Sequence, residues 1–381
     1  MLKVMTIFGT RPEAIKMAPV VKALEAAPDM EAIVTVTAQH REMLDQVLNL
    51  FHITPHYDLN IMCQGQTLYD VTSKALMGLR DVIADAKPDV VLVHGDTTTT
   101  FAGALAAFYQ EVPVGHVEAG LRTGNIYSPF PEEMNRKLTG SLATYHFAPT
   151  SSAEKNLMKE NISSAHLYVT GNTVIDALQT TVQKEYEFEE TLLNELDYEN
   201  RRVVLVTTHR RENLGEPMRH VYRAIHRLVE AFDDIEVVFP VHRNPQVRQI
   251  VKEELGDVDR VHLINPLDYE PFANLMARSY LLMTDSGGIQ EEAPALGKPV
   301  LVLRNTTERP EAVTAGTVRL VGTDENTVYE TAYRLLADRE VYDTMANSVN
   351  PYGDGVAAQR IIEALRFEFL HSGKKPSRFG Y

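Results

Sequence analysis

The sequence has very little cysteine: among its 381 residues only Cys63 carries a thiol. A single cysteine excludes an intramolecular disulfide and any metal site that uses two or more thiolate ligands. Long hydrophobic runs are also missing, since no stretch approaches the ~18 uncharged apolar residues of a transmembrane helix. The opening MLKVMTIFGTRPE lacks the layout of a signal peptide, because a charged turn follows its short apolar run. We therefore expect a protein of the reducing cytoplasm.

Positive charge is scarce as well. Lysine and arginine number 37 against 52 aspartates and glutamates, which gives a formal net charge of −15. A chain this acidic does not fit a general nucleic-acid-binding protein, which presents a basic surface to phosphates, and nothing indicates a membrane partner. Any anionic ligand has to be held by a local cluster of cations, and such a cluster should stand out here.

Familiar cofactor and metal motifs are absent. No G-x-G-x-x-G follows the first expected strand, so a nicotinamide cofactor is not expected. No G-x-x-x-x-G-K-[ST] is present, which argues against a P-loop nucleoside triphosphatase. Neither H-E-x-x-H nor C-x-x-C occurs, so no metal site is indicated. We expect the protein to work without a cofactor.

Short β-branched runs alternate with longer segments that carry apolar residues at helical spacing. Strand, crossover helix and parallel strand in succession predict an open α/β sheet. The first set of expected strands covers Val4–Phe8, Ile33–Thr37, Val90–Val93 and Val114–Val117. The second set covers Val203–Thr207, Glu236–Pro240, Val261–Leu263, Tyr280–Met283 and Val300–Leu303.

Two sets of strands predict two Rossmann-like, doubly wound α/β domains. The charged, weakly patterned stretch Gln183–Arg202, preceded by a turn at Gly171–Asn172, is the best boundary region, although a solvated surface helix and loop would also explain it. We divide the chain into an N-terminal domain at 1–171, a C-terminal domain at 172–365 and a last segment at 366–381. Ligands of such sheets lie beyond the carboxyl ends of the strands, so we expect a ligand in the cleft between the domains. The polar, basic tail Ser372–Tyr381 is expected to fray.

Charged residues follow the expected strands of the N-terminal half. Arg11 lies at the start of a helix, where backbone N–H groups already favour an anion; a phosphate contact and a surface pair with Glu13 both remain open. Lys16, one turn further on, either adds charge to the site or faces solvent. Asp96 follows Val90–Val93 and precedes four threonines. Helix capping alone explains many such aspartates, but threonines are poor helix formers, which suggests that their hydroxyls and backbone matter here.

Two more acidic positions follow in the same half. Glu118 ends an apolar strand and is either salt-bridged to Arg122 or held, partly desolvated, for proton transfer. Two prolines place Glu132 in the first turn of a helix, where a carboxylate also complements the helix dipole. Glu132 and Arg136 are four residues apart and should face the same way. Asp96, Glu118 and Glu132 follow successive strands or strand-end loops, so we expect them to converge as an acid–base set.

Cations and glycines follow the strands of the C-terminal half. His209 and two arginines come directly after Val203–Thr207, a cluster that fits a pyrophosphate better than a solvated surface. His242 follows the next strand but is weak evidence, because a lone histidine is usually structural. Ser286–Gly288 opens a helix with several N–H donors and no side chain in the way, which predicts a phosphate cradle. Glu292, one turn later, is placed to accept the hydroxyls of a ribose.

Six strings occur in order along the chain: FGTRPEAIKMAP, VHGDTTTT, GHVEAGLRTG, SPFPEEMNR, THRREN and TDSGGIQEEAP. With them the chain closely resembles the bacterial non-hydrolysing UDP-N-acetylglucosamine 2-epimerases, from Leu2 to about Phe369. The resemblance implies the two-domain fold of the GT-B glycosyltransferases, an active site in the interdomain cleft, and a final helix that crosses back onto the N-terminal domain. It also implies a homodimer.

The resemblance assigns roles to individual positions. The family's catalytic positions correspond to Asp96, Glu118, Glu132 and His209. Its UDP-binding positions correspond to Arg11, Ser286, Gly287, Gly288 and Glu292, and further residues implicated in activity to Lys16 and Arg136. Some members bind a second, activating UDP-N-acetylglucosamine, and that regulatory site corresponds to Gln39, Gln66, Glu132, Arg210 and His242. Gly65 departs from the pattern, since close relatives often have arginine there.

The reaction implied by the resemblance is interconversion of UDP-N-acetylglucosamine and UDP-N-acetylmannosamine. It would proceed by elimination of UDP to 2-acetamidoglucal and re-addition, and its product would supply cell-surface polysaccharide. A retaining glycosyltransferase that uses a UDP-sugar, a hydrolysing epimerase and a UDP-sugar sensor are the alternatives. The three acidic positions argue against a sensor, because binding an anion does not call for carboxylates.

Overall fold

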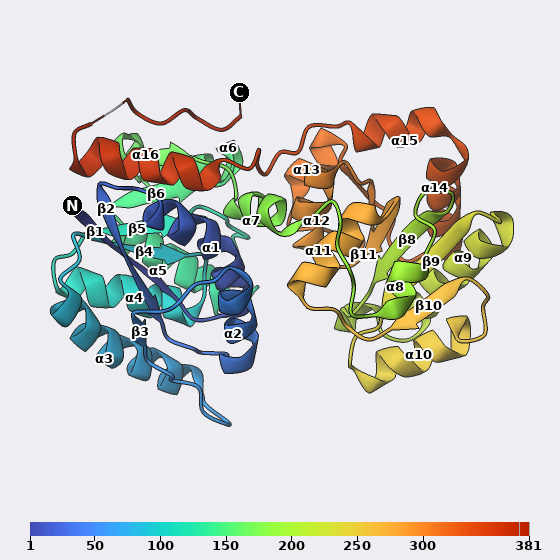
Figure 1. Cartoon of the computed structure of the whole chain (residues 1–381), viewed down its shortest axis with the longest axis horizontal. Helices are drawn as coiled ribbons and strands as arrows, with labels where there is room; N and C mark the ends of the chain where they lie inside the picture. The colour runs from blue at the N-terminus through green and yellow to red at the C-terminus, as the bar shows by residue number, and fades with distance from the viewer. Residues whose placement is uncertain (373, 381) are drawn as a thin grey trace. The chain divides into compact units, whose positions relative to one another are not determined.

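The computed structural model describes residues 1–372 and 374–380 and contains two β-sheets, each built of parallel strands (Figure 1). One compact unit comprises Met1–Gln179 and the segment from Tyr352 onward, and the other comprises Thr180–Pro351. The chain therefore leaves the first unit at Gln179, beyond the Gly171–Asn172 turn. It re-enters that unit at Tyr352, ahead of the final helix.

The first unit contains a seven-stranded sheet in the order β3-β2-β1-β4-β5-β6-β7, with parallel pairings throughout the described strands. Its strands are β1 (Leu2–Phe8), β2 (Met30–Val36), β3 (Tyr57–Asp58), β4 (Val90–His94), β5 (Val114–Val117), β6 (Tyr145–Ala148) and β7 (Leu167–Val169). The order reverses between β1 and β4. Ligands of open α/β sheets bind at such a switch point, beyond the carboxyl ends of the strands.

Helices connect these strands and cover the sheet. They are α1 (Arg11–Glu25), α2 (Arg41–Leu50), α3 (Leu68–Ala86), α4 (Thr98–Tyr109), α5 (Glu132–Leu142), α6 (Ser151–Lys159), α7 (Thr173–Thr181) and α16 (Ala357–Phe369). Gly103 lets α4 approach the sheet closely, because a Cβ there would lie 3.2 Å from Val93 and 3.3 Å from Ile7. The helix that follows the switch-point strand β4 is thus held tightly on β1 and β4.

The second unit contains a six-stranded sheet in the order β10-β9-β8-β11-β12-β13, again with parallel pairings. Its strands are β8 (Arg202–Thr207), β9 (Ile235–Pro240), β10 (Val261–Ile264), β11 (Leu281–Thr284), β12 (Val300–Val302) and β13 (Val318–Leu320). Its helices are α8 (Thr191–Glu195), α9 (Glu216–Ala231), α10 (Pro245–Leu255), α11 (Tyr269–Arg278), α12 (Ile289–Glu292), α13 (Pro310–Ala315), α14 (Glu325–Ala337) and α15 (Arg339–Ala346). The switch point lies between β8 and β11.

The predicted class, two doubly wound α/β domains, is confirmed. Four strands that the sequence pattern did not reveal, β3, β6, β7 and β13, are two to four residues long. Runs this short carry too few residues to show a period. Three of them, β3, β7 and β13, lie at the edges of their sheets. Within the described part of the chain, every helix is too short or too polar to cross a membrane.

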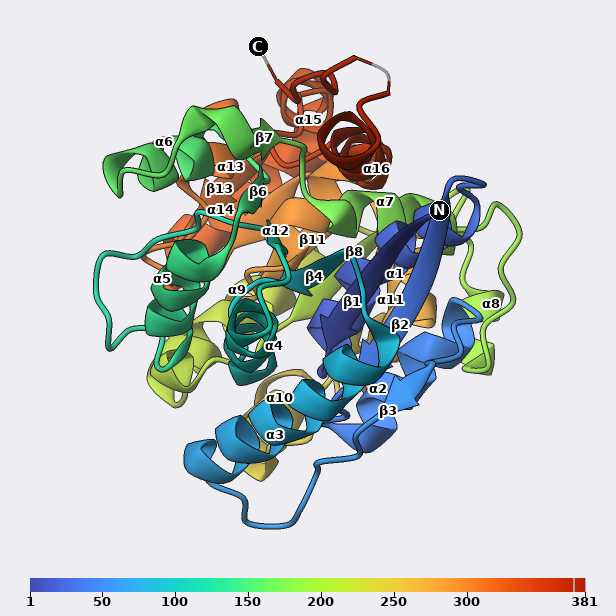
Figure 2. The same ribbon diagram turned by 90° about the vertical axis from the view of Figure 1, so that its left-hand side faces the viewer.

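The final helix and the tail both pack on the first unit. Helix α16 lies along α1, and Arg366 on α16 pairs with Asp29 at 2.7 Å (Figure 1, Figure 2). The expectation of a frayed tail is wrong at Arg378 and Phe379. Arg378 is ion-paired with Glu154, and the backbone N–H of Phe379 donates to a carbonyl at the end of β7. Gly373 and Tyr381 lie outside the described residues.

Candidate active site

One buried carboxylate, that of Glu13, joins the loops that follow β1 and β4. Its Oε2 accepts hydrogen bonds from the backbone N–H groups of Gly9 (3.1 Å) and Thr10 (2.9 Å). Its Oε1 accepts the hydroxyls of Thr97 (2.8 Å) and Thr100 (3.1 Å). Burial raises the pKa of Glu13, and these donors offset that effect only in part. Two of the four consecutive threonines therefore hold the loop at the switch point.

Glu118 directly follows β5 and is held by side chains from three other segments. Its backbone φ is +59°, a left-handed conformation that is uncommon for residues other than glycine. The nearly buried carboxylate pairs with Lys16 of α1 and accepts a hydrogen bond from Asn172 Nδ2 at 3.0 Å. The imidazole Nε2 of His94 lies 3.8 Å away, and burial lowers the pKa of His94 to about 4. A neutral imidazole and a cation thus flank this carboxylate at neutral pH.

Asp96 follows β4 and pairs with Arg136 of α5. The Asn135 amide donates to the backbone oxygen of Asp96 at 2.9 Å, and Arg136 also lies 3.4 Å from the buried carboxylate of Glu133. The partners of Arg136 are therefore Asp96 and Glu133, not Glu132, four residues before it. The side chain of Glu132 is half-exposed on the first turn of α5, with no hydrogen bond or ion pair inside the described ranges.

The loops that carry Asp96 and Glu118 lie close together. Gly95, just before Asp96, has φ +70°, and a Cβ on it would lie 3.8 Å from Glu118 Oε1. The structure therefore brings Asp96, Glu118, Lys16 and Arg136 to one edge of the first sheet. The sequence predicted that Asp96, Glu118 and Glu132 converge; Glu132 lies on the first turn of α5, the helix that carries Arg136.

These contacts decide two alternatives that the sequence left open. The oxygens of Glu13 are taken by backbone and threonine donors, so Arg11 is not paired with it. Arg11 is the first residue of α1 and is half-buried, with no ion pair among the residues described. Arg122 binds Glu160 through two hydrogen bonds of 2.9 and 2.7 Å, so it is not the partner of Glu118.

In the second unit, Asp285 joins the loops that follow β11 and β8. Its fully buried carboxylate accepts the backbone N–H groups of His209 and Arg210, each at 2.9 Å, and lies 3.0 Å from His209 Nδ1. Burial opposes ionisation, but the hydrogen bonds from His209 and Arg210 outweigh it and lower the pKa of Asp285. The partly exposed rings of His209 and His242 stack, with centroids 5.6 Å apart. The cationic loop is thus held in place by a buried anion.

The glycine turn beside this loop has an open backbone. Ser286 N–H donates to the Thr284 hydroxyl at 3.0 Å, and a Cβ on Gly287 would meet nothing within 4 Å. The helix α12 that follows has only four residues, ending at Glu292. Burial raises the pKa of Tyr269 well above 10, and the adjacent carboxylate of Glu292 raises it further. The turn offers room for a ligand against its backbone.

The expected regulatory positions fall in both units. In the first unit, the Thr99 hydroxyl donates to Gln39 Oε1 at 3.1 Å, while Gln66 Oε1 accepts the backbone N–H of Cys63 at 3.1 Å. Gly65, next to Gln66, has φ +72°, a conformation that glycine adopts without strain. Arg210 and His242 lie in the cationic loop region of the second unit, as described above.

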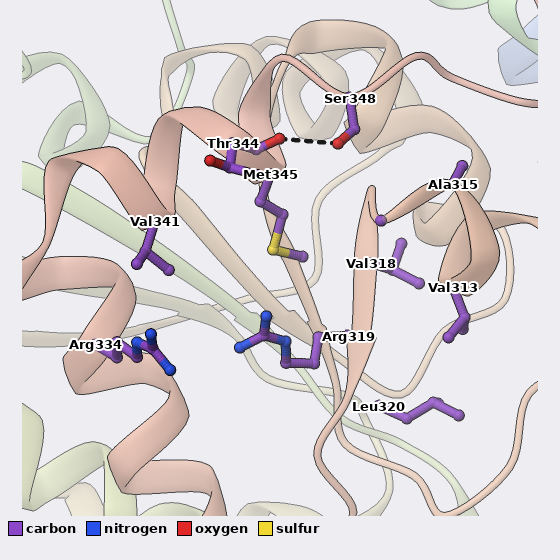
Figure 3. Close-up of a pocket in the computed structure, with 11 residues that line it drawn as sticks. Val313, Ala315, Val318, Arg319, Leu320, Arg334, Val341, Thr344, Met345 and Ser348 are labelled. Carbon is purple, nitrogen blue, oxygen red and sulfur yellow. Dashed lines mark hydrogen bonds between the residues drawn. The ribbon is translucent and has the colours of Figure 1, made fainter.

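A separate cavity of about 630 Å³ lies at the edge strand β13 of the second unit (Figure 3). Side chains from β13, α13, α14 and α15 line it, including Arg319, Arg334 and Met345. None of the predicted site residues belongs to its lining. Among residues 1–372 and 374–380, no three His, Cys, Asp or Glu side chains gather closely enough to hold a metal ion.

Sequence reasoning missed three residues that hold the site together: Glu13, Asn172 and Asp285. Two of them could have been noticed. Glu13 lies three residues after Thr10, which is the capping-box spacing, and Asp285 directly follows a buried strand. For Asn172 no sequence signal indicated a contact with Glu118, 54 residues away.

Comparison with known proteins identifies the relatives of this chain. The family profile described as UDP-N-acetylglucosamine 2-epimerase matches residues 22–366. The UDP-N-acetylglucosamine 2-epimerase of Bacillus subtilis strain 168 is 58% identical over 378 residues, which cover 99% of this chain and 98% of the relative. The S. aureus MnaA–UDP co-structure has a TM-score of 0.89 at 51% identity and covers all of both chains.

A further solved structure is that of the Neisseria meningitidis UDP-GlcNAc 2-epimerase bound to UDP-GlcNAc. It has a TM-score of 0.85 at 52% identity and covers 96% of this chain and 99% of that one. The profile match, the identity over nearly the full length and the shared fold lead to one conclusion: this chain belongs to the UDP-N-acetylglucosamine 2-epimerase family.

Proposed function

We propose that this protein interconverts UDP-N-acetylglucosamine and UDP-N-acetylmannosamine by eliminating UDP and adding it back. The observation that carries the proposal is the pair of ion-paired carboxylates, Asp96 and Glu118, at the ends of the neighbouring strands β4 and β5. The second unit adds an open glycine backbone beside a cationic loop. The family membership and the Neisseria relative bound to UDP-GlcNAc support the substrate.

The chemistry of the substrate favours elimination. Carbon 2 of the sugar has no adjacent carbonyl, so its proton is not acidic enough to be removed alone. In the elimination a carboxylate accepts that proton, the C2–H electrons form a C1=C2 double bond, and UDP leaves with the electrons of the C1–O bond. The product, 2-acetamidoglucal, then takes a proton on the opposite face while UDP re-adds to C1. No external oxidant or reductant is needed.

We assign the proton transfers to Asp96, Glu118 and Glu132. General acid–base help from one positioned group contributes about 10²–10⁴-fold. Lys16 and Arg136 orient two of these carboxylates through their ion pairs. Glu132 enters this set through the family resemblance, and its half-exposed position leaves it accessible to a ligand.

We assign the binding of UDP to the glycine turn and its neighbours. The backbone of Ser286, Gly287 and Gly288 would face the pyrophosphate, and Glu292 the ribose. His209 and Arg11 would stabilise the charge that develops on the departing UDP, as preorganised donors do at the point where charge accumulates.

We further propose a homodimer through the outer face of α3, α4 and α5. Large apolar side chains stay exposed on these three neighbouring helices: Leu68, Tyr69, Met77, Phe108, Tyr109 and Leu138. Large apolar side chains exposed on neighbouring helices are typical of interaction surfaces. A cytoplasmic location and a use of the product in surface polysaccharide stay predictions.

Regulation by the substrate is a separate proposal. We propose that a second UDP-N-acetylglucosamine binds at Gln39, Gln66, Glu132, Arg210 and His242 and activates the enzyme. The left-handed backbone at Gly65 would be strained by the arginine that relatives often carry there. This departure bears on the regulatory site and leaves the catalytic assignment unchanged.

Isotope exchange tests the reaction class. With UDP-N-acetylglucosamine in deuterated water, we expect deuterium at C2 of both UDP-sugars and no net release of UDP, measured by NMR and mass spectrometry. The C2 proton is exchanged because it passes through a carboxylate in contact with solvent. A glycosyltransferase would show no C2 exchange, a hydrolysing epimerase would release UDP and free N-acetylmannosamine, and a sensor would bind without turnover; any of these results rejects the proposal.

Removing each carboxylate tests the acid–base set. Asp96→Asn, Glu118→Gln and Glu132→Gln should each lower kcat by about 10²–10⁴-fold, while calorimetry still detects UDP binding. Glu185→Gln, at an exposed carboxylate of the second unit, is the matched control and should keep full activity. Wild-type turnover in any of the three variants removes that residue from the set.

Gly287→Ala tests the phosphate cradle. The added methyl meets no protein atom within 4 Å, so the thermal midpoint should hardly change. The methyl would occupy the space that we assign to the pyrophosphate, so the Kd for UDP should rise at least about tenfold, a loss of ~1.4 kcal/mol. Unchanged UDP affinity in a folded variant would place the nucleotide elsewhere.

The reverse reaction tests the regulatory site. Starting from pure UDP-N-acetylmannosamine, turnover should stall until a trace of UDP-N-acetylglucosamine is added, because only UDP-N-acetylglucosamine binds the proposed activating site. In His242→Ala, which loses part of the proposed activating site, the stall should persist after the same trace of UDP-N-acetylglucosamine is added. Immediate full-rate turnover of UDP-N-acetylmannosamine by the wild-type protein argues that no activation occurs.

A further inference from the structure

The Gly171–Asn172 turn lies beside Glu118. Asn172 is buried, and its Nδ2 donates to Glu118 Oε2 at 3.0 Å. Its Oδ1 accepts the backbone N–H of Val174 at 3.1 Å, and its own N–H donates to the carbonyl of Tyr352 at 2.6 Å. The side-chain amide of Asn172 is therefore fixed at both ends. Its oxygen accepts a hydrogen bond from the first turn of α7, and its nitrogen donates one to the Glu118 carboxylate.

The segment that carries Glu118 packs on a small apolar cluster. Ala119 is buried there together with Ala148, Ala153, Leu157, Leu167 and Val169. The next residue, Gly120, has φ +92°, and a Cβ on it would lie 2.3 Å from the carbonyl oxygen of Ala153. Because Glu118 also has a positive φ, its conformation depends on the packing around it.

Phe379, near the C-terminal end of the chain, covers this cluster and the turn. Its side chain packs on the cluster, and its N–H donates to the carbonyl of Val169, the last residue of β7, at 2.8 Å. A Cβ on Gly171 would lie 3.5 Å from Phe379 Cγ, so the ring lies against the turn. The Arg360 guanidinium lies 5.7 Å from the ring centroid and donates to the Thr170 carbonyl at 2.9 Å.

We propose that Asn172 is a positioning residue for Glu118 and that Phe379 keeps Asn172 in place. The C-terminal segment thereby contributes to turnover without touching the substrate. The inference rests on the catalytic role proposed for Glu118. It joins two features that the proposed function leaves unexplained, namely the Gly171–Asn172 turn and the contacts of Phe379.

Other groups that face Glu118 stay intact when this network is altered. Lys16 on α1 and His94 at the end of β4 contact the carboxylate from segments that neither Asn172 nor Phe379 belongs to. Changes at Asn172 or Phe379 should therefore remove one hydrogen bond from Glu118 and leave its ion pair.

The test compares Asn172→Ala, Phe379→Ala, Phe379→Leu and the double alanine variant in the full chain. Asn172→Ala should lower kcat by up to about 100-fold, the effect of a small misplacement of a reacting group. Phe379→Ala should lower kcat about 2- to 30-fold, and Phe379→Leu, which keeps an apolar side chain, should stay near wild type. The KM for UDP-N-acetylglucosamine should stay nearly constant. The double variant should be no slower than Asn172→Ala, because both act through one contact.

A second measurement does not depend on turnover. In protein labelled with ¹³C at the glutamate carboxyls, the resonance lost in Glu118→Gln identifies Glu118, and its titration should move to higher pH in both alanine variants. Loss of a hydrogen bond to the charged form raises a carboxyl pKa. If the wild-type protein proves not to epimerise the substrate, the proposed function fails while this titration still tests the positioning. Losses of kcat that multiply in the double variant, or an unchanged Glu118 titration in folded Phe379→Ala, overturn the inference.

Discussion

In both sheets one buried carboxylate joins the two loops at the switch point. Glu13 joins the loops that follow β1 and β4, and Asp285 joins those that follow β11 and β8. At a switch point the connections leave in opposite directions, so the loops on either side are not linked by the chain. A carboxylate has two oxygens with several acceptor positions, and it can bind donors from both loops at once. Arg11 and Asp96 in the first unit, and His209 and Ser286 in the second, lie on these loops or directly after them, so their positions depend on this constraint.

The two carboxylates differ in their electrostatic setting. Burial raises the pKa of Glu13, whose donors are neutral hydroxyl and backbone groups. Asp285 is equally buried, but the imidazole of His209 and two backbone N–H groups lower its pKa. The difference suits their positions: Asp285 remains an anion beneath a cationic loop, whereas Glu13 serves as a hydrogen-bonding centre among threonines.

Glu118 combines local backbone strain with long-range support. Non-glycine residues rarely adopt a positive φ, and strained positions of this kind persist only where the surroundings over-determine them. Here the support comes from α1 through Lys16, from the turn before α7 through Asn172, and from the apolar cluster that Phe379 covers. A catalytic carboxylate needs such support, because a displacement of about 1 Å in a reacting group costs about 100-fold in rate.

Local pattern was enough to predict the longer strands, the two sheets and the polar strand ends, since periodicity and turn chemistry act between near neighbours in the chain. The short strands β3, β6, β7 and β13 were missed. The same pattern predicted that Asp96, Glu118 and Glu132 converge at the strand ends of one sheet and that Ser286–Gly288 opens a helix with exposed N–H donors. Only the tertiary structure showed that Arg136 binds Asp96, 40 residues away, and that Asn172 reaches Glu118. It also showed that Arg378 and Phe379 of the tail contact the first unit. These contacts depend on strand order and on packing between distant segments, and no spacing within one helix or strand encodes them.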